Sequence, residues 1–480
     1  MTAQPRRFAT GIPGLDDILK GGFVEGASYI IQGKPGAGKT IFANQIAFAS
    51  VAAGRKVLYV TLLAETHDRL FQSLSTIDFF DKNELGANIS YVSVFQTLRD
   101  EGLSAVVSLL REETARKQAT LLVFDGLLNA RDRADTDLDV KTFVAEVQNQ
   151  AAFVGCTVLF LASARDLGEN PEHTMVDGVL ELKEEVVGVR SARRLQVRKS
   201  RASDSLGGLH TYEISSKGIT LYPRLEAALG SQMDDEGSVS APVGSGIEGL
   251  DDLLGGGLPE ASVTLAYGPT GSGKTSLGLS FLGESNETSP GLLFGFYETP
   301  GRLRLKARTL GLDFNKLIEA GHLEVVWQRL GENILDKLAY RLLDAVSRRN
   351  VKRLVIDGLG GFDRAATAPH RLLEFYAALT AELRAKGVTT IATWELRELF
   401  GPSLTMPGPE ISAVLDNLIM LRNVEMDSQY TRVLSVIKVR DSDCSTQLHR
   451  VDFSKQGLKV VAPLAPVAGA MTGIATSSEG

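Results

Sequence analysis

Two short glycine-rich runs in the sequence have the residue types that bind phosphate, "GKPGAGKT" at 33–40 and "GPTGSGKT" at 268–275. Both fit the pattern G-x-x-x-x-G-K-[ST], in which small residues let successive backbone N–H groups surround phosphate oxygens. A Gly-rich turn without function is the alternative interpretation. Because each run lies between a strand-like and a helix-like segment, and the pattern occurs twice, the sequence predicts two sites for a nucleoside triphosphate.

The residues expected to contact the nucleotide are the small residues, lysines and threonines of the two runs: Gly33, Gly36, Ala37, Gly38, Lys39 and Thr40 in the first, and Gly268, Gly271, Ser272, Gly273, Lys274 and Thr275 in the second. The lysine of such a loop reaches the β- and γ-phosphates, and the hydroxyl that follows it ligates Mg²⁺. ATP and Mg²⁺ are therefore the predicted cofactors, with Thr40 and Thr275 as metal ligands.

An aspartate closes a short apolar run later in each half, Asp125 in "ATLLVFDG" and Asp357 in "VKRLVIDG". A carboxylate at the end of such a strand can hold the hydration shell of Mg²⁺. The alternative is an ordinary aspartate that begins a turn before Gly126 or Gly358. Since both runs follow a phosphate loop, we expect the metal role.

Hydrolysis also needs a carboxylate that orients or deprotonates the attacking water. The candidates are Glu65 in "TLLAETHDR" and Glu298 in "GFYETPGR", each after the second strand-like run of its half. Each is followed by threonine and a helical segment, so a charge at a helix N-terminus is the alternative. We expect both to be catalytic.

The chain is an internal repeat: "TGIPGLDDILKGGF" at 10–23 returns as "SGIEGLDDLLGGGL" at 245–258, and Gly246 and Lys274 each lie 235 residues after Gly11 and Lys39. Apolar runs rich in Val, Ile and Leu alternate with helical patterns in both halves, as in a parallel sheet covered on both faces. The fold class is therefore α/β, with two tandem P-loop domains, each a mostly parallel sheet with helices on both faces.

Composition places the domain boundaries. We expect a first domain over 1–230, a polar, Gly/Ser-rich linker over 231–244, a second domain over 245–463 and a flexible tail over 464–480, which is rich in Ala, Gly, Pro and Ser.

Net charge and cysteine spacing limit the partners and the compartment expected for this protein. A formal net charge of −7 over 480 residues supplies no global basic field for DNA or an anionic membrane. Cys156 and Cys444 show no disulfide or zinc spacing, which indicates a reducing compartment, and Cys156 reads as a buried thiol. No signal peptide and no run of roughly 18 apolar residues is present. We expect a cytoplasmic protein without a membrane segment.

The opening "GIPGLDD", the phosphate loops, the acidic residues and the duplication together resemble the KaiC family of RecA-like ATPases, over nearly the whole chain. The resemblance implies two tandem RecA-like domains, stacked rings of six subunits, and nucleotides bound between neighbours. It also implies that a K-x-R pair reaches the neighbour's nucleotide, which gives Lys199 and Arg201, and Lys438 and Arg440. Alternation along a strand places both side chains of a pair on one face; a solvated basic edge is the alternative.

The sequence departs from this family at two points. The family usually carries adjacent glutamates after the second strand, but "LLAET" and "FYET" have one each, and Tyr297 stands where the first is expected. Since a tyrosine cannot serve as a carboxylate base, we expect most turnover in the first domain. Autokinase members carry a Ser-Thr pair, whereas this chain has Ser412 and Ala413.

Three functions follow. The first is a KaiC-like ring, a homo-hexamer that binds and slowly hydrolyses ATP as a nucleotide-dependent regulatory assembly, with a regulatory protein partner at the C-terminal tail. The second is a serine/threonine autokinase that uses Ser412 as its phosphosite. The third is a RecA-like DNA-dependent ATPase, for which "VRSARRLQVRKSRAS" at 189–203 is the best support. That run lacks aromatic residues for base stacking, so we expect no nucleic-acid partner.

Overall fold

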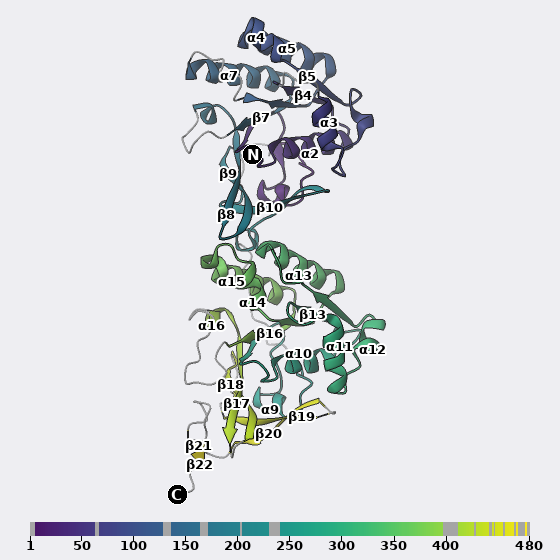
Figure 1. The fold of residues 1–480 in the computed structure, drawn as a ribbon, viewed down its shortest axis with the longest axis vertical. Helices are drawn as coiled ribbons and strands as arrows, with labels where there is room; N and C mark the ends of the chain where they lie inside the picture. The colour runs from purple at the N-terminus through teal and green to yellow at the C-terminus, as the bar shows by residue number, and fades with distance from the viewer. Residues whose placement is uncertain are drawn as a thin grey trace. The chain divides into compact units, whose positions relative to one another are not determined.

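A nine-stranded sheet forms the centre of each of the two units into which the chain folds, Met1–Ala228 and Leu229–Gly480 (Figure 1). The structure is a computed structural model. It describes residues 5–62, 67–127, 136–163, 171–201, 204–229, 241–396, 411–426, 429–440, 444–445, 447–454, 457–464, 467–468 and 476–477.

The strands of the first unit are β1 (Arg7–Phe8), β2 (Phe23–Val24), β3 (Ser28–Gly33), β4 (Val57–Thr61), β5 (Ile89–Ser93), β6 (Leu121–Asp125), β7 (Thr157–Ser163), β8 (Gly178–Val187), β9 (Arg190–Ser200), β10 (Leu209–Ser215) and β11 (Gly218–Tyr222). Its helices are α1 (Leu15–Ile18), α2 (Lys39–Ala52), α3 (Asp68–Leu74), α4 (Phe95–Glu101), α5 (Leu103–Lys117), α7 (Asp137–Phe153) and α8 (Leu225–Leu229), with short 3₁₀ helices at Lys82–Glu84 and Pro171–Thr174.

The large sheet of the first unit has the order β11-β10-β9-β8-β3-β7-β6-β4-β5. The strands from β8 to β5 run parallel, and β9, β10 and β11 continue the sheet as antiparallel strands. Because parallel strands end at the same edge, the phosphate loop after β3 and the aspartate at the end of β6 meet there, where open α/β sheets bind ligands.

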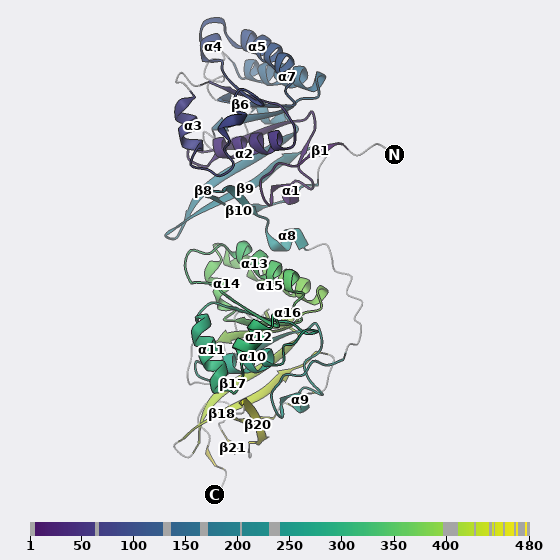
Figure 2. The ribbon, with the colours of Figure 1, turned by 90° about the vertical axis from the view of Figure 1, so that its right-hand side faces the viewer.

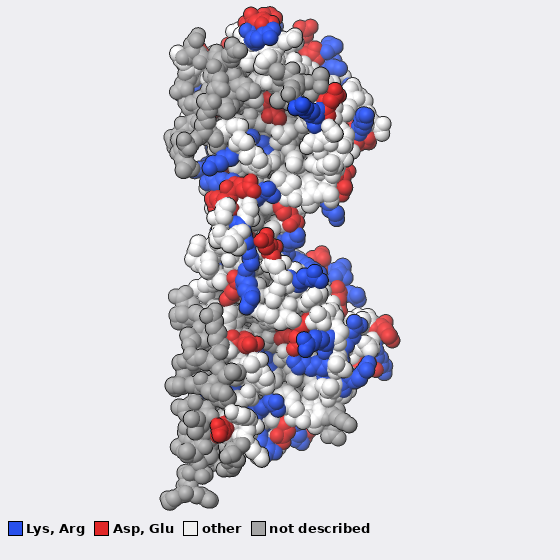
Figure 3. Space-filling model, viewed as in Figure 1, with Lys and Arg blue, Asp and Glu red and all other residues white. Residues whose placement is uncertain are grey.

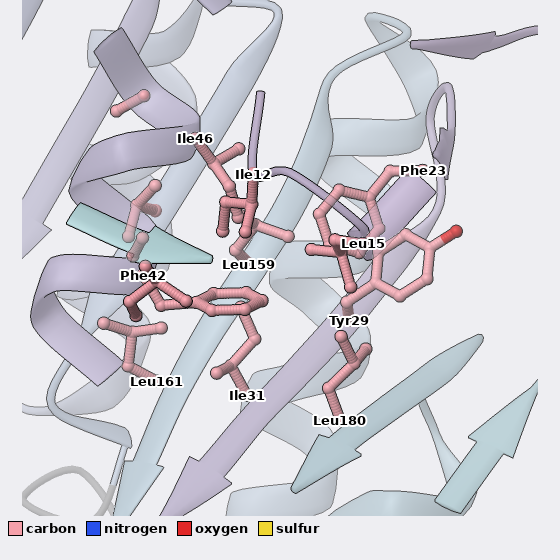
Figure 4. Close-up of a cluster of buried hydrophobic side chains, with 14 of the residues drawn as sticks. Ile12, Leu15, Phe23, Tyr29, Ile31, Phe42, Ile46, Leu159, Leu161 and Leu180 are labelled. Carbon is pink, nitrogen blue, oxygen red and sulfur yellow. The ribbon is translucent and has the colours of Figure 1, made fainter. Parts of the chain in front are cut away.

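Two hydrophobic cores cover the two faces of this sheet. Phe42 and Ile46 of α2 pack on Ile31 and Leu159 on one face (Figure 4). On the other face α5 and α7 pack on residues such as Phe160, and Figures 1 and 2 show these helices on the far side of the strands from α2. Successive residues of a strand point to opposite faces, so nearly continuous apolar strands are what this arrangement requires.

The strands of the second unit are β12 (Val263–Gly268), β13 (Gly291–Gly295), β14 (Leu323–Trp327), β15 (Arg353–Asp357), β16 (Thr389–Glu395), β17 (Asn417–Met426), β18 (Gln429–Lys438), β19 (His449–Ser454), β20 (Gly457–Pro463), β21 (Val467–Ala468) and β22 (Thr476–Ser477). Its helices are α9 (Leu250–Leu253), α10 (Lys274–Gly283), α11 (Pro300–Thr309), α12 (Phe314–Glu319), α13 (Leu335–Arg349), α14 (Gly360–Ala365), α15 (Leu372–Ala385) and α16 (Ile411–Val414), with a 3₁₀ helix at Pro369–Arg371.

The second sheet, β14-β13-β15-β16-β12-β17-β18-β19-β20, repeats the order and strand directions of the first. Leu277 and Phe281 of α10 and Leu303 of α11 belong to the core on one face. Figures 1 and 2 show α13 and α15 on the other face, where Leu342 and Phe375 are buried. The predicted fold class, two tandem α/β domains with helices on both faces, is confirmed.

Some local details differ from the sequence-based expectations. The sequence predicts strands at the two basic pairs, which lie at the ends of β9 and β18. It does not predict the antiparallel pairing or the strands β10, β11, β19 and β20, because their alternating polar pattern gives no strong signal beside the apolar central strands. In the region expected to be a flexible tail, β21 pairs with β22. The domain and linker boundaries stay predictions; the described units divide at Ala228 and Leu229.

Acidic and basic side chains are interspersed on the face drawn in Figure 3, with Lys and Arg gathered around α11. This helix carries Arg302, Arg304, Lys306 and Arg308 and no acidic residue. None of the helices in the described part of the chain combines the length and apolar character that a bilayer crossing needs.

Two candidate nucleotide sites

The two phosphate loops connect a central strand to the first turn of a helix in the same way. β3 ends at Gly33 and α2 begins at Lys39, while β12 ends at Gly268 and α10 begins at Lys274. The residue before each helix has a left-handed backbone, with φ of 92° at Gly38 and 107° in the second loop. Only glycine adopts this conformation without strain, so the motif's last glycine is required by the backbone itself.

Close packing explains the first glycine of each loop. A Cβ atom at Gly33 would lie 2.5 Å from the carbonyl oxygen of Leu182, and one at Gly268 would lie 2.0 Å from that of Leu421. Both neighbours belong to the adjacent parallel strand. The loops therefore lie directly on the sheet, and their backbone N–H groups remain close to the helix N-terminus, which favours an anion.

Each loop lysine points back into its own loop. Lys39 Nζ donates to the carbonyls of Gly33 and Lys34 at 2.7 and 3.1 Å, and Lys274 Nζ to those of Gly268 and Pro269 at 2.8 and 2.6 Å. Burial lowers the pKa of both ammonium groups, because desolvation disfavours their charged form. A phosphate anion at the loop would restore the favourable surroundings that burial removes.

The predicted metal residues come together in both units. Thr40 Oγ1 lies 3.4 Å from Asp125 Oδ2, and Thr275 Oγ1 lies 3.2 Å from Asp357 Oδ1. Burial raises the pKa of both carboxyl groups, because desolvation outweighs the opposing effects of Lys39 on Asp125 and of Lys306 on Asp357. A hydroxyl beside a carboxylate offers the hard oxygen ligands that Mg²⁺ prefers, so these residues fit the predicted metal.

A cavity of about 760 Å³ opens at the second loop. Lys274, Thr275 and Asp357 line it together with the predicted catalytic residue Glu298. Glu298 Oε1 accepts a hydrogen bond from Lys306 Nζ of α11 at 3.0 Å. The carboxylate that the sequence predicted for hydrolysis is therefore held by a cation within the site.

Tyr297, the residue before Glu298, also lines this cavity and is 50% exposed. Its ring covers Gly358, where an added Cβ would lie 2.3 Å from the tyrosine Cε2. Burial raises the pKa of the Tyr297 phenol, so the group stays protonated at neutral pH and cannot act as a base. Glu65, the corresponding candidate of the first unit, lies outside the described residues.

The predicted basic pairs lie at the ends of strands rather than within them. Lys199 and Lys438 are in β9 and β18, but Arg201 and Arg440 follow the last strand residue, so the expectation that each pair alternates along one strand is wrong for the arginines. Lys199 and Arg201 do converge: both donate to the carbonyl of Thr174, at 3.2 and 3.1 Å.

In the second unit the pair makes different contacts. Lys438 Nζ donates to the carbonyls of Ser412 and Leu415 at 3.1 and 2.9 Å, and Arg440 forms an ion pair with Asp416 at 3.1 Å. Ser412 is half-buried in the first turn of α16. A role of these residues at a neighbour's nucleotide stays a prediction.

Sequence reasoning missed several residues that contact the predicted site residues directly or through one further side chain. Tyr59 and Thr393 donate hydrogen bonds to Asp125 and Asp357, Asn44 donates to Tyr59, and Lys306 binds Glu298. Tyr59 stands in the middle of a mostly apolar strand, which is a signal that could have singled it out. Thr393 is one of three threonines in β16, so nothing in the sequence distinguishes it.

Comparisons with known proteins agree with the duplicated architecture. A family model described as "ATPase: KaiC" matches residues 8–226 and again residues 243–465. The circadian clock protein KaiC3 of a Synechocystis species is 24% identical over 97% of this chain and 94% of that protein. The circadian clock oscillator proteins KaiC of Acaryochloris marina and Thermosynechococcus vestitus are also 24% identical, over 95% and 96% of this chain and 88% and 90% of the relatives.

Proposed function

This chain belongs to the KaiC family of ATPases, and from that premise we propose that it binds and slowly hydrolyses ATP at two sites in a homo-hexameric ring. The ring acts as a regulatory assembly that signals its nucleotide state to a protein partner. The observation that carries the proposal is the same pairing, in both units, of a phosphate-loop threonine with a strand-end aspartate, Thr40 with Asp125 and Thr275 with Asp357.

The residues divide the work of nucleotide binding. The loop N–H groups and Lys39 or Lys274 would bind the phosphate oxygens, and the threonine and aspartate would hold Mg²⁺, which would neutralise part of the triphosphate charge. Glu298 would orient a water at the second site, and its hydrogen bond with Lys306 supports this role by balancing its charge. We assign the same role to Glu65 at the first site from the repeat.

Tyr297 supports an unequal division of turnover between the sites. By the resemblance to the family, the protonated phenol stands where a further glutamate is expected, and it offers no carboxylate to the attacking water. The second site therefore holds ATP longer than the first. Nucleotide bound at a slow site can report the state of the ring, as a regulatory role requires.

Single substitutions of the two loop lysines test this proposal. Lys39→Ala is expected to reduce steady-state ATPase activity of the full chain at least about tenfold, and Lys274→Ala to leave most of it, since each lysine contacts the transferred phosphoryl group only at its own site. Bound nucleotide counted after gel filtration should fall by half in both variants. Loss of ATPase in Lys274→Ala with retention in Lys39→Ala would reverse the assignment.

A serine autokinase is the second candidate, and one contact favours it. The Ser412 carbonyl accepts from Lys438, the lysine expected to reach a neighbour's nucleotide, so this serine would lie close to that nucleotide if Lys438 has the expected role. Incubation with Mg²⁺ and labelled ATP, followed by mass spectrometry, tests the candidate. Stoichiometric label that disappears in Ser412→Ala supports it, and an unlabelled protein with active ATPase excludes it.

The basic run that favoured DNA binding is engaged within the first unit. Arg194 pairs with Glu185 at 3.1 Å and Arg198 with Glu181 at 2.7 Å, both across the β8–β9 hairpin. Since these carboxylates offset the arginine charges, we do not propose a DNA-dependent activity.

A further inference from the structure

The two candidate metal aspartates are held by different partners. In the first unit, the Tyr59 hydroxyl of β4 donates to Asp125 Oδ2 at 3.2 Å, and the tyrosine is fully buried. Asn44 Nδ2 of α2 donates to the Tyr59 hydroxyl at 3.1 Å, and the Tyr91 hydroxyl of β5 donates to Asn44 Oδ1 at 2.6 Å. Three donors therefore point in one direction, toward the carboxylate.

The second unit has an apolar residue at each of these places. Asp125 pairs with Thr61 of β4, and Tyr59 lies two residues before Thr61. Asp357 pairs with Gly295 of β13, and Leu293 lies two residues before Gly295. Leu293 is therefore the counterpart of Tyr59. Leu279 lies 235 residues after Asn44, which is the equivalent position in the repeat. Asp357 instead accepts from Thr393 Oγ1 of β16 at 2.8 Å.

The first unit has no hydroxyl where the second has Thr393. On the neighbouring strand β7, the residue paired with Asp125 is Leu161. In the second unit Ile356 pairs with Ala392 of β16, so the next residue, Thr393, lies beside Asp357. Leu161 and Thr393 therefore hold equivalent positions. Each unit therefore has one strand-borne hydroxyl on its aspartate, supplied from opposite neighbouring strands. The hydroxyl, rather than the residue that carries it, is the common feature.

We propose that Tyr59, supported by Asn44 and Tyr91, is a positioning residue that orients Asp125 for Mg²⁺ at the first nucleotide site. This inference rests on the proposed function. Tyr59 and Thr40 both contact Oδ2, which restricts rotation of the carboxylate and fixes it toward the phosphate loop. In a chain of hydrogen bonds that share one direction, each donor polarises the next, so the last bond to the carboxylate is strengthened.

The experiment uses full-length protein that carries Lys274→Ala, which confines nucleotide binding to the first site. ATPγS binding is titrated by calorimetry with increasing Mg²⁺ and, separately, in EDTA. Tyr59→Phe removes only the hydroxyl, and we expect it to raise the Mg²⁺ concentration for half-maximal binding roughly tenfold, the scale of one hydrogen bond to a charged group. Binding in EDTA is expected to be unchanged.

Two further variants make the result specific. Tyr29→Phe removes a buried hydroxyl elsewhere in the same unit and is expected to leave the Mg²⁺ dependence unchanged. Leu161→Thr, added to Tyr59→Phe, introduces the hydroxyl that the second unit uses and is expected to restore part of the Mg²⁺ affinity.

Asp125→Asn separates this inference from the proposed function. If it raises the Mg²⁺ requirement while Tyr59→Phe does not, the positioning role is overturned and the metal role stands. If Asp125→Asn leaves the Mg²⁺ requirement unchanged, the metal role itself fails. Weaker binding of Tyr59→Phe in both Mg²⁺ and EDTA would make Tyr59 a structural residue and overturn the inference.

Discussion

At the residue scale, the candidate sites contain charges that folding alone does not favour. Lys39, Lys274, Asp125 and Asp357 all have pKa values shifted toward the neutral form by burial. A buried charge without a full complement of partners lowers stability. Residues of this kind are retained where a ligand uses them, which agrees with phosphate and metal binding.

Replacement of Asp357 by asparagine is expected to stabilise the protein in the absence of nucleotide and metal. Burial raises the pKa of this carboxyl from 3.8, so the folded state binds the proton more tightly than the unfolded chain does. Stability from this group is full below pH 3.8 and is lost as the pH rises through the raised folded pKa. Above the raised folded pKa the penalty is complete, and Asp357→Asn removes it.

We expect Asp357→Asn to raise the free energy of unfolding by about 1 kcal/mol at pH 7.5 in EDTA, with a smaller gain at pH 5. Urea denaturation measures both. Asp344→Asn, at a carboxylate that is 77% exposed, serves as the control and is expected to have no effect. A decrease in stability for Asp357→Asn in EDTA would contradict this account of the buried charge.

Lys306 is expected to matter for nucleotide affinity because it compensates Glu298. Without the ammonium at 3.0 Å, the glutamate would stand unpaired near Asp357 and repel the triphosphate. In a Lys39→Ala background, Lys306→Met should weaken ATPγS binding at the second site about three- to tenfold, a modest effect because the pair is partly solvated. Lys306→Arg should retain most of the affinity.

A double-mutant cycle tests the cause of that loss. Once Glu298→Gln has removed the negative charge, Lys306→Met should have little further effect on ATPγS affinity. Equal losses in the presence and absence of the glutamate charge would mean that Lys306 binds the nucleotide directly, and tighter binding by Lys306→Met alone would reject both roles.

The motif residues were predictable from sequence because their chemistry is local. A loop of fixed length between a strand and a helix fixes where Lys274 and Thr275 lie relative to the phosphate. Lys306 and Thr393 could not be predicted in this way. They reach the site from another helix and another strand, and their contacts depend on sheet order and on the packing of α11, which no local spacing encodes.

At the element scale, the phosphate loops depend on the antiparallel part of each sheet. The ring of Phe453, from β19, lies against the second loop, and a Cβ at Gly273 would come within 2.4 Å of its Cζ atom. Ile214 of β10 has the same relation to Gly38, at 2.6 Å. The strands that sequence analysis missed therefore cover the loops that it identified.

Gly273→Ala is expected to damage the second site through this contact. The substitution combines a clash with Phe453 and a φ of 107°, which together should lower the free energy of unfolding by about 1–3 kcal/mol and weaken ATPγS binding. Gly301→Ala, in α11 with open space around its Cβ position, is the matched control and should be neutral or slightly stabilising. Normal binding by Gly273→Ala would contradict the proposed packing of the loop.

Element boundaries explain one error of the sequence analysis. Alternation predicted that Lys438 and Arg440 share a strand face, but β18 ends at Lys438. Arg440 turns instead to Asp416, which also binds Arg384 of α15. The sequence signals of a strand are strong in its apolar interior and weak at its ends, where side-chain partners decide the path of the chain.

At the scale of the whole molecule, the two units share a fold and differ at their sites. The second has Tyr297 and Lys306 around its glutamate, and the first has the hydrogen-bonded chain from Tyr91 to Asp125. A duplicated ATPase with unlike sites can hydrolyse ATP at one and retain it at the other. We propose this difference as the physical basis for a regulatory rather than a purely catalytic role.

Ring formation follows from the proposal that the basic pairs act on a neighbouring subunit's nucleotide. Both basic pairs lie at the edge of their own sheet that is opposite the phosphate loop. This holds for Lys199 with Arg201 and for Lys438 with Arg440. If they bind phosphate across an interface, nucleotide stabilises the assembly by mass action, because it binds the ring and not the separate subunit. Oligomerisation should then depend on ATP.

Native mass spectrometry of the full-length protein with ATP and Mg²⁺, with ADP, and without nucleotide tests the account most directly. With ATP the account predicts a mass of six chains of 51.6 kDa, together with nucleotide at both sites of every chain, and smaller species when nucleotide is removed. Lys39→Ala and Lys274→Ala should each halve the bound nucleotide. A monomer at micromolar protein with saturating ATP and Mg²⁺ would contradict the account.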